Sequence, residues 1–223
     1  TSTDRTIILP DETGTLLTTG SVPITTTATS NIGLGSGAVD SITTGDYNVG
    51  LGDNAGTAIT TGSNNIAVGM NSLTANTTGG NNTAVGKDAL LANTTGGNNV
   101  AVGYKAFEDN TTGTGNSAVG QGALRNNTTA SNNTAMGKDA LNGNTTGTNN
   151  VAVGKSALAA NTTANGNIAV GVNALDATTT GASNIGIGHE ALGANTTGGE
   201  NVAIGYGALD ANIGTSNNTA VGY

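Results

Sequence analysis

A glycine recurs every 17 residues from Gly35 to Gly222 without one insertion or deletion, and an asparagine lies four residues before each of these glycines. Eleven complete copies of this unit and the first six residues of a twelfth occupy 31–223. A short, fixed period is typical of solenoids, because one unit cannot bury its apolar face alone and has to stack on the next. The period therefore restricts the chain to a stack of nearly identical coils, each coil being one turn of the solenoid.

The length of the unit limits what one coil can contain. Seventeen residues are too few for a strand, a helix and two turns, and they suit two short strands joined by two tight corners. In the unit at 99–115, Val100–Val102 alternates as a strand does, and Ala106–Phe107 opens the opposite side. The second corner is predicted at Asn110–Gly113, because asparagine and glycine accept the positive φ angles of tight turns. The sequence thus predicts an all-β fold, a parallel β-solenoid of about twelve coils.

Two columns of the repeat, a column being the same position in successive coils, are strict in size. The Val102 column always holds Val, Leu, Ile or Met, and the Ala101 column holds only Ala or Gly. Since neighbouring strand residues face opposite ways, we expect both faces to be packed. One face would fill the lumen of the coil together with the Leu124 column, and the other would meet a second chain. This favours an oligomer, preferably a parallel homotrimer. The alternative is a monomer whose lumen is too narrow for residues larger than alanine.

The asparagine four residues before each glycine has a structural interpretation. Stacked amide side chains can hydrogen-bond along the axis as a ladder and satisfy the polar groups of a corner. The same chemistry of turns explains sequons such as Asn76-Thr77-Thr78 better than glycosylation does. The predicted ladder consists of Asn65, Asn82, Asn99, Asn116, Asn133, Asn150, Asn167, Asn184, Asn201 and Asn218.

The chain divides into two parts. Residues 1–30 do not repeat and predict a strand at Thr6–Leu9, a turn, a strand at Thr15–Thr18 and a threonine-rich connector. Residues 31–223 form the array, which would be about 57 Å long if neighbouring strands are ~4.8 Å apart. Solenoids need caps at their ends, and Tyr223 follows a repeat glycine directly, so we expect the array to continue in a longer protein.

Composition excludes several classes of function. The net charge is −8, with 14 acidic and 6 basic residues and no basic run, so we expect no binding to nucleic acid. No apolar stretch approaches the ~20 residues of a membrane span, so we expect no membrane insertion. There is no cysteine, the single histidine is His189, and the acidic residues are scattered. We therefore predict no catalytic, cofactor-binding or metal-binding residues, and no enzyme.

Several runs of the array carry a family resemblance. Asn64-Asn65-Ile66-Ala67-Val68-Gly69, Asn98-Asn99-Val100-Ala101-Val102-Gly103 and Asn167-Ile168-Ala169-Val170-Gly171 resemble the N-S-V-A-I-G repeats of trimeric autotransporter adhesin heads. The longer pattern, with Asn-Thr-Thr-Gly corners, and the opening run from Asp4 to Leu17 look like phage tail-fibre sequence. The resemblance implies a left-handed β-roll, a homotrimer, a location outside the cell or on a virion, and attachment to a host surface.

The column after each glycine varies freely and faces solvent in this interpretation. Tyr104, His189 and Tyr206 lie in it, and they are candidate contacts for a cell-surface glycan or protein receptor. The alternative is that residues at exposed positions vary without any role in binding. A second function class is also open, an ice-binding solenoid in which Asn93, Thr95 and their equivalents form two outward ranks.

Overall fold

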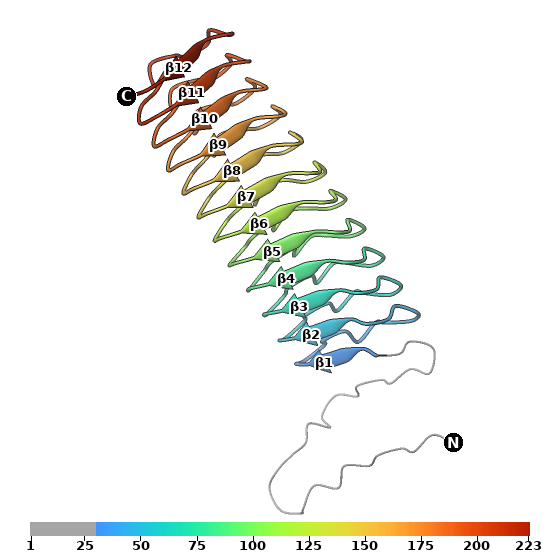
Figure 1. The fold of residues 1–223 in the computed structure, drawn as a ribbon. Coiled ribbons are helices and arrows are strands. Elements are labelled where there is room, and N and C mark those ends of the chain that lie inside the picture. The colour runs from blue at the N-terminus through green and yellow to red at the C-terminus, as the bar shows by residue number, and fades with distance from the viewer. Residues whose placement is uncertain (1–29) are drawn as a thin grey trace, which may run out of the picture.

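The computed structural model describes residues 30–223, so the predicted strands at 6–9 and 15–18 lie outside the described residues. Twelve strands of three residues each form one parallel sheet in chain order, and the coils stack into a rod (Figure 1). The strands are β1 (Ile32–Leu34), β2 (Val49–Leu51), β3 (Ile66–Val68), β4 (Thr83–Val85), β5 (Val100–Val102), β6 (Ser117–Val119), β7 (Thr134–Met136), β8 (Val151–Val153), β9 (Ile168–Val170), β10 (Ile185–Ile187), β11 (Val202–Ile204) and β12 (Thr219–Val221).

Each strand pairs with the next strand at an offset of one repeat. Val100 lies beside Ser117 and Ala101 beside Ala118, so every residue is stacked on its own column. The predicted all-β parallel β-solenoid is therefore confirmed, with eleven complete coils between β1 and β12. The register follows from the sequence, because only an offset of one repeat keeps all alanines on one face and all aliphatics on the other.

The prediction of two strands per coil is wrong, because each described coil contains only one. The side that begins at Ala106 consists of turns, and the residues before and after this alanine, Lys105 and Phe107, have φ angles of 54° and 53°. Left-handed residues cannot continue a strand. The equivalent leucines, such as Leu124 with φ 54°, share this conformation, which costs about 1–3 kcal/mol for a residue that is not glycine. Their complete burial offsets this cost.

The lumen of the solenoid is packed by two columns of small and large apolar side chains. The alanines of the strands from Ala67 to Ala203 are fully buried, and so are Leu124 and its equivalents from Leu73 to Leu192. The Val102 column points outward instead, and Val119 and Met136 are 38% and 44% exposed. The expectation that both strict columns are packed is thus met only for alanine within one chain.

The glycine after each strand allows the coils to approach closely at this corner. Gly137 has φ 134°, and a Cβ atom there would lie 2.5 Å from the carbonyl oxygen of Gly154 in the next coil. Only glycine combines this φ with such a close contact. Glycine therefore recurs at this position because the positive φ angle and the close approach of the next coil exclude other residues. We call this column the glycine corner.

The first coils depart from the repeat, and the structure shows how the lumen stays filled there. Gly56 replaces the usual leucine, and Ile59 replaces the asparagine three residues later. A Cβ atom on Gly56 would lie 2.9 Å from Cδ1 of Ile59, which is fully buried. The isoleucine side chain therefore occupies the volume that the leucine fills in later coils.

Candidate interaction surfaces

The outward side of the sheet is a largely apolar surface, in which the polar residues are Thr83, Ser117, Thr134 and Thr219. We call it the strand face, and it consists of the first and third residues of every strand, such as Ser117 and Val119 in β6. Its third-residue column is aliphatic or Met in all twelve strands, and the face contains no charged residue. Exposed apolar patches of this length mark interaction sites in soluble proteins. The strand face is therefore the main candidate interaction surface.

The predicted asparagines, from Asn65 to Asn218, lie at the corner that precedes each strand, and they form a hydrogen-bonded ladder. The Oδ1 atom of Asn99 accepts the backbone N–H of Asn116 at 2.9 Å, and the Nδ2 group of Asn99 donates to the carbonyl of Gly113 at 2.8 Å. Several rungs also have a direct amide contact, as between Asn116 Nδ2 and Asn99 Oδ1 at 3.3 Å. The ladder satisfies buried polar groups of two corners at once, so its role is structural.

Sequence reasoning missed a second buried ladder, in the column of Asn93. Asn110 Nδ2 donates to Asn93 Oδ1 at 2.6 Å, and Asn93 Nδ2 donates to Asn76 Oδ1 at 2.8 Å. Asn93 is fully buried, which corrects the expectation of an outward asparagine rank. The exposed rank is the column of Thr95. We call the segment from this asparagine to the following glycine, 93–96 in its coil, the threonine corner.

The second ladder is interrupted at Thr178, which stands where other coils have asparagine. The Thr178 hydroxyl donates to the carbonyl of Asn195 at 3.0 Å and offers nothing to Asn161. The Oδ1 atom of Asn161, which would accept from an asparagine at 178, is consequently buried without a hydrogen-bond partner. Asn195 Oδ1 also lacks a partner, and Asn212 Nδ2 in the next coil donates to the carbonyl of Thr215. The break therefore leaves a defect inside the lumen.

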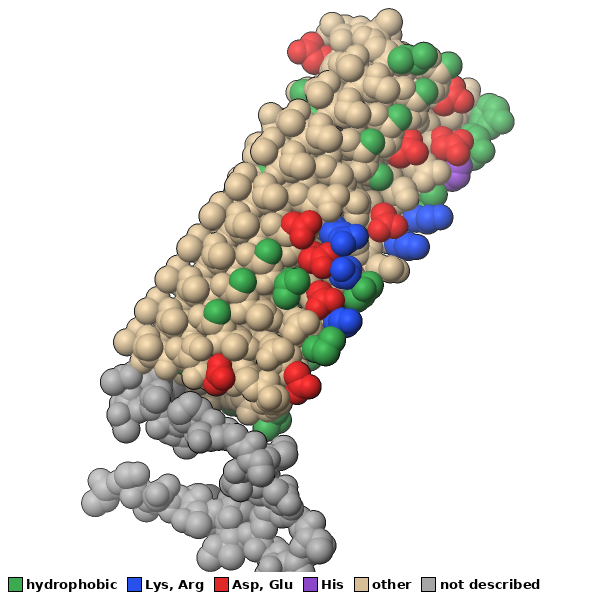
Figure 2. All heavy atoms as spheres, turned by 180° about the vertical axis from the view of Figure 1, so that it is seen from behind, with side chains coloured by type: hydrophobic (Ala, Val, Ile, Leu, Met, Phe, Trp, Pro, Cys, Tyr) green, Lys and Arg blue, Asp and Glu red, His purple; other side chains and the backbone are tan. Residues whose placement is uncertain are grey.

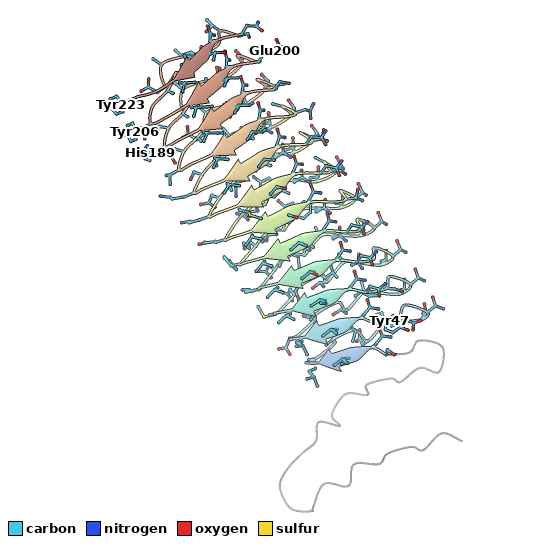
Figure 3. The ribbon with its side chains drawn as sticks, viewed as in Figure 1. Tyr47, His189, Glu200, Tyr206 and Tyr223 are labelled. Carbon is cyan, nitrogen blue, oxygen red and sulfur yellow. The ribbon has the colours of Figure 1, made fainter. Side chains whose placement is uncertain are left out.

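Two of the three predicted contact residues are brought together by the fold. His189 and Tyr206 stack with ring centroids 5.0 Å apart, and Tyr206 stacks on Tyr223 at 5.5 Å (Figure 3). Tyr104 lies five coils earlier, and Lys105 Nζ lies 5.7 Å from its ring centroid. Both faces of the Tyr206 ring are covered by its neighbours, so it presents its edge and its hydroxyl outward.

Next to the glycine corner, charged side chains gather along one edge of the rod (Figure 2). We call this edge the charged corner, and it consists of the columns of Tyr104, Lys105 and Glu108. Glu108 is nearly buried and accepts hydrogen bonds from Lys105 Nζ at 2.8 Å and from Arg125 Nε at 2.6 Å. Burial alone would raise the pKa of Glu108, but the hydrogen bonds and the positive charges of Lys105 and Arg125 together outweigh it and hold the pKa below 4.5. The hydrogen bond to Glu108 raises the pKa of Lys105.

Residues 30–223 contain no group of three or more His, Asp or Glu side chains placed to hold a metal ion. Within the same range, no helix could cross a membrane. A shallow hollow lies at the C-terminal end of the array, lined by 209–215 and Asn218.

The fold and these surfaces define the chain as a parallel β-solenoid repeat protein with buried asparagine ladders. Comparison with known proteins adds no closer assignment, since no family model, curated protein or solved structure matches the chain.

Proposed function

We propose that the chain is a structural and adhesive segment of a fibre, a rigid rod that associates with two further copies of itself and attaches to a cell surface. The observation that carries the proposal is the third-residue column of the strand face, which is aliphatic or Met in all twelve strands. A column that faces only water tolerates polar residues, as the column of Tyr104 does. Its strictness therefore supports contact with another chain.

The dimensions of the strand face suit an interface between copies. Twelve strands at ~4.8 Å and three residues at ~3.3 Å give an area of about 57 Å by about 10 Å. This projected area of about 570 Å² is smaller than the ridged accessible area, and it approaches the ~800 Å² that one partner contributes to a standard interface. A second copy brings no like charge against it, because neither outward column is charged.

A parallel homotrimer is the arrangement we propose, with a left-handed coil as the family resemblance implies. When three copies run parallel, their coils have the same spacing along the axis. Each coil then contacts the equivalent coil of the other two copies. Such a rod would be located outside the cell or on a virion surface. Its role there is attachment and spacing, with no catalytic step.

The native mass in solution tests the association. We expect light scattering on the full chain to give three times 21.4 kDa. Val119→Asp with Val153→Asp should produce monomers, because both residues lie on the strand face and are exposed or half-buried in one chain. The matched control is Thr129→Asp with Thr163→Asp, the same charge change on the threonine corner of the same two coils. A monomeric wild-type protein, or a double variant that stays trimeric, would refute the association.

A binding assay tests the attachment. We expect labelled protein to bind cells, and Tyr104→Ala with His189→Ala and Tyr206→Ala to reduce this binding. Tyr47→Ala is the control, since Tyr47 is an exposed tyrosine on the opposite edge of the rod from His189 and Tyr206 (Figure 3). If the triple variant binds like the control, the predicted contact residues are not the attachment site.

One observation favours a second candidate function, an ice-binding solenoid. The Thr95 column holds exposed threonine in ten successive coils, from Thr44 to Thr197. The Thr94 column is unsuited, because its hydroxyl donates to the carbonyl of the next coil, as from Thr94 to Thr111 at 3.0 Å. A thermal-hysteresis assay decides this candidate, since a fibre segment without ice affinity should show no hysteresis.

A further inference from the structure

We infer that the charged corner binds a linear acidic polysaccharide along the axis of the rod. This inference deepens the proposed function by naming a ligand class for attachment, and it rests on that function only for its biological setting. The sequence suggested no basic surface, because its cations are far apart along the chain. Superposition of the coils brings them together.

All lysines and arginines of the described residues lie on this corner at mid-length. Figure 2 shows them gathered along one edge of the rod. They occupy five successive coils, 82–166, and so span about 19 Å at ~4.8 Å per coil. Among the described residues outside 82–166, the titratable side chains other than tyrosine are Asp, Glu and His189. The five cations are Lys87, Lys105, Arg125, Lys138 and Lys155.

The exposed part of this corner is positive, although the same coils contain four acidic residues. Two of these acids are more buried than their partners: Lys87 is 51% exposed and Asp88 11%, and Arg125 is 42% exposed and Glu108 9%. The other two, Asp109 and Asp139, are more accessible, and Asp139 is 40% exposed beside Lys138 at 55%. Lys155 is exposed and has no ion pair within 30–223. Asp88 and Glu108 thus hold their cations from the buried side, and five cations face two accessible carboxylates, so the exposed part of the corner carries net positive charge.

The spacing of these charges favours an acidic polysaccharide over nucleic acid. The corner offers about one cation per coil of ~4.8 Å, whereas a single nucleic-acid strand carries one charge per ~3.4 Å and a duplex twice as many. The net charge of −8 also repels a densely charged polymer. A carboxylated sugar chain carries its charges a sugar unit or more apart. Tyr104 and Gln121, between Lys87 and Lys138 in one column, add hydroxyl and amide groups for sugar hydroxyls.

Titration calorimetry on the full chain with polygalacturonate, with dextran as the neutral polymer, tests the inference. We expect binding of polygalacturonate but not dextran at about 0.01 M ionic strength, and weaker binding at about 0.15 M because surface charges are then screened. Lys138→Gln with Lys155→Gln should weaken binding by about three- to tenfold. The control, Thr146→Glu with Thr163→Glu, makes the same change of net charge on the threonine corner of the same coils and should bind like wild type.

Three results would overturn the inference. Wild-type protein that binds no polygalacturonate has no such site, and equal weakening by both double variants would mean that net charge alone governs binding. Single-stranded DNA that binds more tightly, with the same dependence on Lys138 and Lys155, would make the corner a nucleic-acid site. The native mass and the cell-binding assay are independent of these results, so the proposed fibre function can stand when the ligand class fails.

Discussion

Replacement of Thr178 by asparagine should stabilise the solenoid, because it repairs the interrupted ladder. The new Nδ2 group would donate to Asn161 Oδ1, which is buried without a partner, and to the carbonyl of Gly181, as in the other coils. Asn195 Nδ2, now 3.4 Å from the Thr178 hydroxyl, would gain an amide oxygen as its acceptor. The column already holds asparagine in neighbouring coils, so the lumen has room for it.

The size of the effect follows from the bonds gained and lost. A buried acceptor without a partner costs about 1–3 kcal/mol, and the lost hydroxyl bond to the Asn195 carbonyl contributes about 0.5–1.5 kcal/mol. With the second new bond included, we expect a net gain of about 1–2 kcal/mol in the free energy of unfolding. For a chain of this size the gain corresponds to a Tm increase of about 2–8 °C.

Circular dichroism during thermal unfolding measures the shift, and hydrogen exchange locates it. Stability in a solenoid is a sum over neighbouring units, so slower exchange should be confined to coils around 161–195. Thr179→Asn is the control, because it removes the bond from Thr179 to the Thr196 carbonyl and satisfies no buried acceptor. A Thr178→Asn protein that is no more stable than wild type would show that the unpaired Asn161 oxygen costs nothing, and the reasoning would be refuted.

Three further substitutions examine the packing and the ion pairs. Gly137→Ala should destabilise the protein by about 2–6 kcal/mol through strain and overpacking. Gly222→Ala, with nearly the same φ and no atom within 4 Å, should cost only the strain, so equal losses in denaturant unfolding would contradict the close-approach explanation. Leu124→Ala should cost about 2–5 kcal/mol by leaving a cavity in the lumen, and a loss below 1 kcal/mol would mean that the coil collapses around it. Glu108→Gln should be less stable than wild type at neutral pH, because the lowered pKa of Glu108 stabilises the fold above its unfolded pKa. This contribution is lost as pH falls through the folded pKa, which lies below 4.5, so the difference between the two free energies of unfolding should shrink in acid. A difference that does not depend on pH would point to packing.

Much of the fold could be predicted from the columns of the repeat. The period specifies the stacking, and the Ala101 and Val102 columns specify a strand with one narrow face and one aliphatic face. The asparagine before each strand predicts a ladder, and the described residues contain one. These inferences succeed because each of these positions occurs in twelve coils. A position that tolerates few residue types therefore shows the same type in every coil.

The second side of the coil could not be predicted in this way. Left-handed φ angles at Lys105 and Phe107 turn that side into consecutive turns, although neither residue type favours the conformation. The left-handed conformation is stabilised by burial of the large side chain in the lumen. This burial exists only when the coil is closed. The inward position of Asn93 has the same origin, since a threonine corner can turn its asparagine either way until the neighbouring coils supply hydrogen-bond partners.

The sequence by itself determined the period, the parallel register and the strict apolar and alanine columns, because these follow from identical residues stacked on one another. Only the tertiary structure decided which strict column fills the lumen and which faces outward. It also gathered five cations, dispersed between 87 and 155, along one edge. The physical reason is the same for both: a repeat specifies which residues are neighbours along the axis, but the closure of each coil specifies which side of the chain faces inward.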